Sequence, residues 1–426
     1  MEKQVFSNRF GDTYACFTLD SGLKVYVMEK PDFSSSYALF GTKYGSIDTS
    51  FSTDGGKTFV NVPEGIAHFL EHKLFESEDG DAFSRYAETG ASANAYTSFD
   101  RTCYLFSCSE KFTENFDILL DFVQHPYFTA ETVKKEQGII GQEIRMYDDS
   151  PAWRVLFNML ETMYYEHPVR IDIAGTTDSI AEITDKLLYK CYDTFYNPAN
   201  MFISVAGNVN ADEIALQVEK NLIEKEPVNV IRGSVNEPDS VKCGYTEQYL
   251  DVASPQFCLG FKETVTAPEK TARERIAMGV TLEILAGDCS SLYKELTDEE
   301  LINDEFETEY FTGNGYACVM FSGESADPQS VKKKVIEEID RLLKNGVDGE
   351  LLSTVKRAMY GDILRRFNSC ESIASAMAEC AMFGFGLFDE QELIGSITEE
   401  DIKHCLSQLK EEKSVLSVIL PREQTL

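Results

Sequence analysis

The sequence has few of the features that mark membrane-spanning, secreted or nucleic-acid-binding proteins. It contains no apolar run of about 18 residues, the length that spans a bilayer, and no hydrophobic signal segment follows Met1. Basic residues are scarce, since 39 Lys and Arg stand against 72 Asp and Glu and give a formal net charge of -33. A chain of this charge does not neutralise phosphates, which argues against nucleic acid as a partner. We therefore expect a cytoplasmic protein without a membrane span.

Cysteine pairs with metal-binding or redox spacing are absent. The 11 cysteines are scattered between Cys16 and Cys405 and form no C-x-x-C pair. An odd number in a chain without a signal segment indicates reduced thiols that pack as small hydrophobic residues. We assign them neither a metal nor a redox role.

Histidine is also scarce, yet two of the five histidines stand four positions apart in one short segment. Within Gly65–Lys73, His68 and His72 enclose Glu71 in the order H-x-x-E-H. On a helix, residues i, i+3 and i+4 share one face, so the three side chains would point the same way. This order is the inverzincin signature of zinc peptidases. The alternative is that one histidine belongs to the core and the other to the surface.

The flanking residues predict where this helix begins and which face it buries. Asn61 and Glu64 have the spacing of a capping arrangement around Pro63. The apolar stripe that would face the core consists of Ile66, Leu70 and Leu74.

A catalytic zinc usually has three protein ligands, and the helical stretch 129–146 offers two candidates for the third. Glu136 and Glu143 are seven positions apart and so project from nearly one face. Gly138 and Gly141 lie between them, and each costs about 1 kcal/mol relative to alanine inside a helix. We therefore expect this helix to approach the histidine helix closely. The alternative is a pair of solvated surface glutamates.

The chemistry of such a site is the hydrolysis of a peptide bond. One Zn2+ per chain, held by two histidines and a glutamate, would lower the pKa of water to about 7. Glu71 is then the general base that takes the proton of the water and later passes it to the leaving amine.

The length and the composition along the chain predict two domains. A segment rich in Pro, Gly, Ser and Asn, residues 226–242, reads as a linker between a zinc-binding catalytic domain, residues 1–225, and a second domain without a metal site, residues 243–426. Paired strand patterns occur on both sides, at 91–98 and 102–109 and again at 304–311 and 316–323. We predict an α+β fold of two homologous domains, each an antiparallel sheet covered by helices.

Several stretches together resemble the insulinase, or pitrilysin-type, metallopeptidases. They are the zinc helix 65–76, the small-residue strand 90–97, the glutamates Glu136 and Glu143, and the segments 196–201 and 206–209. The resemblance implies that Glu143 is the third zinc ligand and that Glu136 is an auxiliary acid that supports the site. It also implies that Ala93, Asn94 and Ala95 lie on an edge strand, to which a substrate peptide adds in extended form. The alternative for this stretch is an ordinary strand.

The chain length is similar to that of the short family members, such as mitochondrial processing peptidase subunits and the zinc-bearing chain of Firmicute heterodimers. These pair two chains into a clamshell. The Arg and Tyr with which active members hold substrate are missing from residues 297–306, so we expect a zinc-less paralogue to supply them, or else a homodimer. The predicted function is a zinc endopeptidase of short or unfolded peptides, with basic ones favoured by the acidic charge. The alternative is a catalytically silent structural, assembly or peptide-binding subunit.

Overall fold

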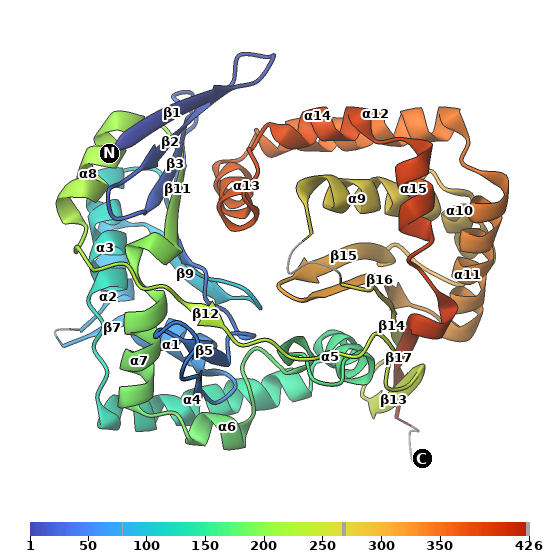
Figure 1. The fold of residues 1–426 in the computed structure, drawn as a ribbon, viewed down its shortest axis with the longest axis horizontal. Coiled ribbons are helices and arrows are strands. Elements are labelled where there is room, and N and C mark those ends of the chain that lie inside the picture. The colour runs from blue at the N-terminus through green and yellow to red at the C-terminus, as the bar shows by residue number, and fades with distance from the viewer. Residues whose placement is uncertain (79, 266–269, 423–426) are drawn as a thin grey trace. The chain divides into compact units, whose positions relative to one another are not determined.

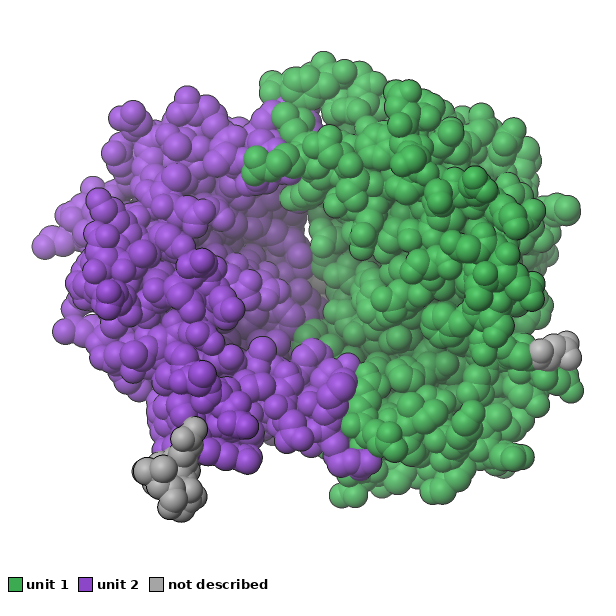
Figure 2. All heavy atoms as spheres, turned by 180° about the vertical axis from the view of Figure 1, so that it is seen from behind, with its two compact units in different colours: residues 1–144, 172–233, 364–388 green, residues 145–171, 234–363, 389–426 purple. Residues whose placement is uncertain are grey.

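Two compact units, each built from several segments of the chain, make up the protein in a computed structural model that describes residues 1–78, 80–265 and 270–422 (Figure 1). Figure 2 colours the two units separately. Unit 1 comprises Met1–Ile144, Asp172–Gly233 and Leu364–Phe388, and unit 2 comprises Arg145–Ile171, Ser234–Ile363 and Asp389–Leu426.

The chain passes between the units five times, whereas the sequence suggested a single linker. One passage, Gly233 to Ser234, lies inside the expected linker 226–242. The other four passages arise at two helices. Each of these helices packs on the sheet of one unit, whereas the chain segments before and after it belong to the other unit. Helix α5 (Pro151–Met163) covers β14 and β17 in unit 2, and α13 (Cys370–Phe383) covers β4 and β11 in unit 1. Contiguous domains 1–225 and 243–426 therefore do not coincide with the compact units.

Unit 1 contains a seven-stranded sheet whose neighbouring strands are antiparallel except for β3 and β11. Its strands, in order across the sheet, are β1 (Glu2–Ser7), β2 (Thr13–Thr18), β3 (Lys24–Glu29), β11 (Met201–Gly207), β4 (Ser36–Thr42), β10 (Thr102–Cys108) and β9 (Ser92–Thr97). The short strands are β5 (Ser50–Ser52), β6 (Val60–Asn61), β7 (Glu76–Ser77), β8 (Gly80–Asp81) and β12 (Ile231–Arg232). The helices besides α13 are α1 (Ile66–Leu74), α2 (Ala82–Thr89), α3 (Phe112–Gln124), α4 (Ala130–Asp148), α6 (Thr177–Ala181), α7 (Asp185–Phe195) and α8 (Ala211–Asn221).

Unit 2 contains a five-stranded sheet of the order β13 (Tyr245–Leu250), β17 (Ser414–Pro421), β14 (Gln256–Lys262), β16 (Tyr316–Glu324) and β15 (Glu307–Gly313). Its helices besides α5 are α9 (Ala272–Ala286), α10 (Ser291–Asp298), α11 (Pro328–Asn345), α12 (Gly349–Arg366), α14 (Asp389–Ser396) and α15 (Glu399–Leu406). Helix α4 ends in unit 2 and α12 ends in unit 1.

The two sheets repeat one arrangement. The order β3-β11-β4-β10-β9 of unit 1 matches β13-β17-β14-β16-β15 of unit 2, with a parallel first pair and antiparallel pairs thereafter. The predicted α+β fold of two homologous domains is confirmed, with one parallel pair added to each antiparallel sheet. By this correspondence β9 and β15 are equivalent edge strands.

Helix α1 begins later than the sequence suggested. The capping arrangement of Asn61 and Glu64 is wrong, because Asn61 lies in β6 and the N-cap is Gly65, in the left-handed region at φ 84°. An added Cβ at Gly65 would lie 2.3 Å from the backbone oxygen of Ala174. The entry of α1 therefore needs glycine both for its backbone angle and for this close approach. The predicted apolar stripe of α1 is buried as expected; its members are Ile66, Leu70 and Leu74.

Two expectations about the whole chain can be compared with the structure. No helix among the described residues is both long and apolar enough to cross a membrane. The 11 cysteines are all free, and nine of them are buried, as expected of thiols that pack as small hydrophobic residues.

Candidate metal centre

Helices α1 and α4 meet through a partly buried hydrogen bond between their side chains. His72 Nδ1 lies 3.0 Å from Glu136 Oε1, and Glu136 is 5% exposed. The expected approach of the two helices is therefore present. Gly138 was expected to make this close approach possible. That explanation is wrong, because an added Cβ at Gly138 would meet nothing within 4 Å.

Three potential metal donors from these helices converge. Glu143 Oε1 lies 3.6 Å from His68 Nε2, and Glu143 Oε2 lies 3.4 Å from His72 Nε2. One donor atom from each of the three residues can be chosen so that all lie within 4.8 Å of one another. Two donors bound to one tetrahedral zinc at about 2.0–2.1 Å are roughly 3.4 Å apart. The separations of Glu143 from both histidines are thus those of ligands that share a zinc ion, and the donor set fits this metal.

The two candidate glutamates of α4 take different places. Glu143 faces the Nε2 atoms of both histidines, whereas Glu136 reaches the far nitrogen of His72. A carboxylate can only accept, so Nδ1–H of His72 donates to Glu136, and Nε2 is the ring nitrogen that faces Glu143 and could bind a metal. Histidine ligands of metals are usually held in this way by an outer carboxylate. Burial lowers the pKa of His72, but the hydrogen bond to Glu136 and the charges of Glu71 and Glu143 outweigh it and raise the pKa overall.

The predicted base, Glu71, lies on α1 and is 8% exposed. Its Oε2 accepts a hydrogen bond of 2.6 Å from Thr97 Oγ1. Thr97 was not among the predicted site residues. The distance in sequence between Glu71 and Thr97 does not reveal that a residue of a helix and the last residue of a strand lie side by side.

The three residues expected to bind substrate lie on β9, which is an edge strand of the seven-stranded sheet, as implied by the family resemblance. Asn94 is exposed, while Ala93 and Ala95 are half-buried on the opposite face. The Asn94 side-chain oxygen accepts a hydrogen bond of 2.9 Å from the Ala95 backbone N–H. The Ala95 N–H therefore points away from β10, toward the open side of the strand.

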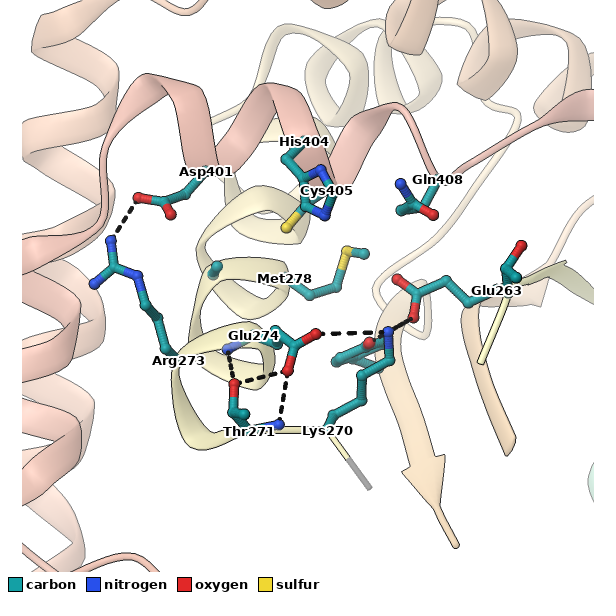
Figure 3. Close-up of a pocket in the computed structure, with 13 residues that line it drawn as sticks. Glu263, Lys270, Thr271, Arg273, Glu274, Met278, Asp401, His404, Cys405 and Gln408 are labelled. Atoms are coloured by element: carbon teal, nitrogen blue, oxygen red, sulfur yellow. Dashed lines mark hydrogen bonds and ion pairs between the residues drawn. The ribbon is translucent and has the colours of Figure 1, made fainter. Parts of the chain in front are cut away.

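Two of the cavities in unit 2 have linings that differ in charge. The first, of 310 Å³, contains none of the α1 or α4 residues, and its charged groups pair with one another (Figure 3): Arg273 with Asp401 at 2.8 Å and Lys270 with Glu263 at 2.7 Å. The second, of 430 Å³, has no basic residue in its lining. Its acidic residues are Glu305, Glu307, Glu309 and Glu324, on β15, β16 and the segment before β15.

Comparisons with known proteins show the family to which the chain belongs. The model of the family described as "Insulinase (Peptidase family M16)" matches residues 61–177, and the one described as "Peptidase M16 inactive domain" matches residues 182–359. A Bacillus subtilis protein named as the zinc protease YmfH is 41% identical over 399 residues, which is 92% of either chain. The chain belongs to the insulinase family of peptidases. The donor group, Glu71 and Glu136 all lie in the part of the chain that matches the insulinase model.

Solved structures extend the comparison with the insulinase family to the whole chain. The crystal structure of an M16-like peptidase from Alicyclobacillus acidocaldarius is 34% identical, with a TM-score of 0.92 over 98% of this chain and 100% of that one. A protease from Helicobacter pylori, 21% identical, shares the fold with a TM-score of 0.83 over 96% of this chain and 100% of that one. The resemblance read from the sequence is therefore confirmed at the level of the family.

Proposed function

We propose that the protein is a zinc-dependent endopeptidase that hydrolyses short or unfolded peptides bound along β9. The observation that carries the proposal is the convergence of His68, His72 and Glu143, with Glu71 on the same turn of α1. A purely structural role would need the fold but places no demand on a carboxylate at position 71. Zinc proteases among the relatives support the same function.

Each residue of the site has a distinct part in this reaction. His68, His72 and Glu143 would hold one zinc ion per chain, which would supply Lewis acidity for the peptide carbonyl and for water. Glu71 receives a proton from the attacking water and delivers it to the leaving amine nitrogen as the C–N bond breaks. Glu136 does not touch the reacting atoms in this scheme; it fixes the ring of His72 through Nδ1.

The substrate adds to β9 as a further strand. The backbone groups of Ala93 and Ala95 on the open side of β9 are the partners for an extended peptide. The Asn94 side chain accepts the hydrogen bond of the Ala95 N–H in this structure, so the side chain must turn aside when the peptide binds. This self-contact also blunts the edge strand against pairing with other chains.

Peptides with basic residues are the favoured substrates in this proposal. The acidic cavity of unit 2 offers four glutamates beside β15, the edge strand equivalent to β9. Desolvation and, to a lesser degree, the charge of the neighbouring Glu307 raise the pKa of Glu309. A lysine or arginine side chain beside these carboxylates would favour their charged form.

We also propose the domain roles and the assembly expected from the sequence. Unit 1 is the zinc-binding catalytic part, and the described residues of unit 2 contain no comparable group of metal donors. The chain works as a dimer, with a zinc-less paralogue that supplies the Arg and Tyr missing from residues 297–306, or with a second copy of itself, and the two chains close around the peptide as a clamshell.

Cleavage of a fluorogenic peptide library tests the proposal. Wild type should cleave in the presence of zinc and of its partner, and a chelator should abolish cleavage. Glu71→Gln should hold a full complement of zinc and be inactive. If wild type and Glu71→Gln are equally inactive with stoichiometric zinc under every condition, with and without the partner, the silent structural or peptide-binding subunit is the correct function.

A further inference from the structure

We propose that Thr97 is a positioning residue for Glu71, and that through Thr97 the strand that receives substrate also orients the general base. The inference rests on the proposed function and deepens it. It concerns a side chain on the substrate strand whose hydroxyl bonds Glu71 and lies beside the hydroxyl of Thr102.

The hydrogen bond between Thr97 and Glu71 has a defined direction. The distance from Thr97 Oγ1 to Glu71 Oε2 is 2.6 Å, as expected for a charge-assisted O–H to carboxylate bond. An ionised carboxylate only accepts, so Thr97 is the donor. The neighbouring hydroxyl of Thr102 does not compete, because it donates to the backbone oxygen of Tyr44 at 2.9 Å and lies 3.4 Å from Thr97 Oγ1.

This contact assigns different tasks to the two oxygens of Glu71. Oε2 is held by Thr97, and no hydrogen bond to Oε1 is found among residues 1–78, 80–265 and 270–422. Oε1 is therefore the atom left to receive the proton of the water. A base must lie within about 2.6–3.2 Å of the proton donor, so a carboxylate free to rotate about its side-chain bonds would spend less time in a productive position.

The position of Thr97 in the sheet makes its hydroxyl a fixed donor. Thr97 is the last residue of β9, directly opposite Thr102 in the pairing with β10, and Thr102 is fully buried. Along β9, Ala93, Ala95 and Thr97 alternate with exposed residues and share one face. A peptide that pairs with Ala93 and Ala95 would restrain the strand two residues before Thr97, so substrate binding steadies the donor that orients the base.

Three variants, each loaded with zinc and assayed with its partner, test this role. Thr97→Val removes the hydroxyl at nearly constant volume, and Thr97→Ser retains it. Thr194→Val is the matched control, because Thr194 is 3% exposed and its hydroxyl bonds the Lys190 backbone oxygen within α7. The readouts are kcat, KM, zinc content and the crystal structure of each zinc-loaded variant.

Thr97→Val should lower kcat about 10- to 100-fold, the size expected for a lost hydrogen bond to a charged group, and change KM by less than about threefold. Its zinc content should equal that of wild type. Thr97→Ser should recover most of the kcat, and Thr194→Val should behave as wild type. In the crystal structure of Thr97→Val, the Glu71 carboxylate should leave the position that it holds in wild type.

Two results would overturn the inference: a kcat of Thr97→Val equal to that of wild type, or a Thr97→Ser variant as impaired as Thr97→Val. The crystal structures decide the case in which wild type itself does not cleave peptides. The proposed function then fails, whereas the positioning role stands if Glu71 moves in Thr97→Val and falls if Glu71 keeps its place.

Discussion

Substitution of Glu136 by glutamine probes the centre most directly, because it separates the residue that orients a ligand from the ligands themselves. In the structure Glu136 Oε1 lies 3.0 Å from His72 Nδ1, and the glutamate is 5% exposed. Glutamine keeps the size and one acceptor oxygen but removes the charge. The variant therefore weakens the hold on the ring of His72 without emptying the space around it.

The expected loss of zinc affinity follows from this contact. A hydrogen bond to a charged group contributes about 1.5–3 kcal/mol, and every 1.4 kcal/mol is about tenfold in a dissociation constant. Outer carboxylates of metal sites typically contribute about 10- to 100-fold in affinity. Because Glu136 is buried, water cannot compensate for the weaker hydrogen bond to His72. We therefore expect Glu136→Gln to raise the zinc Kd by about 30- to 100-fold.

Zinc titration against a competing chelator at neutral pH measures this change. Glu131→Gln is the matched control, since Glu131 is exposed in the first turn of the same helix α4 and should leave the Kd unchanged. Glu143→Gln, which removes the negative charge of a direct zinc ligand, should lose far more affinity than Glu136→Gln. The reasoning is refuted if Glu136→Gln binds zinc as wild type does, or if Glu136→Gln and Glu143→Gln are equally impaired, because Glu136 would then act as a ligand.

Three further predictions concern catalysis, pH and the entry of α1. Glu71→Gln should retain one zinc per chain by metal analysis and lose about 10²- to 10⁴-fold in kcat, the usual contribution of a general base. Burial raises the pKa of Glu237, but hydrogen bonds from Lys262 and three backbone amides outweigh this effect and hold the pKa below the usual 4.5. The ionised carboxylate therefore stabilises the fold above pH 4.5. This stabilisation is lost as the pH falls through the folded-state pKa of Glu237. Glu237→Gln should therefore lower the free energy of unfolding by about 2–4 kcal/mol at pH 7, measured by urea titration, and by progressively less as the pH falls below 4.5; a loss that does not change with pH would contradict the charge argument. Gly65→Ala should lower the free energy of unfolding by more than about 1 kcal/mol in the same assay, because φ is 84° and the new Cβ would clash with Ala174, while Gly138→Ala, in open space within α4, should be neutral or stabilising.

The fold was predictable where one local pattern repeats. The strand pairs at 91–98 with 102–109 and at 304–311 with 316–323 correspond to β9 with β10 and to β15 with β16. What the sequence pattern missed is the exchange of α5 and α13 between the units. An amphipathic helix shows that it has a face to bury, but the sequence does not say against which of two similar sheets.

The candidate metal centre was likewise predictable from the sequence only in part. The sequence by itself determined that His68, Glu71 and His72 share a face of α1, because the helical period alone places residues i, i+3 and i+4 together. Spacing within α4 could not choose between Glu136 and Glu143, since both project toward one side. Only the tertiary structure decided that Glu143 faces both Nε2 atoms while Glu136 takes the far nitrogen of His72, and that Thr97 reaches Glu71. These contacts depend on how separate helices and a strand pack in three dimensions, and no local spacing encodes that packing.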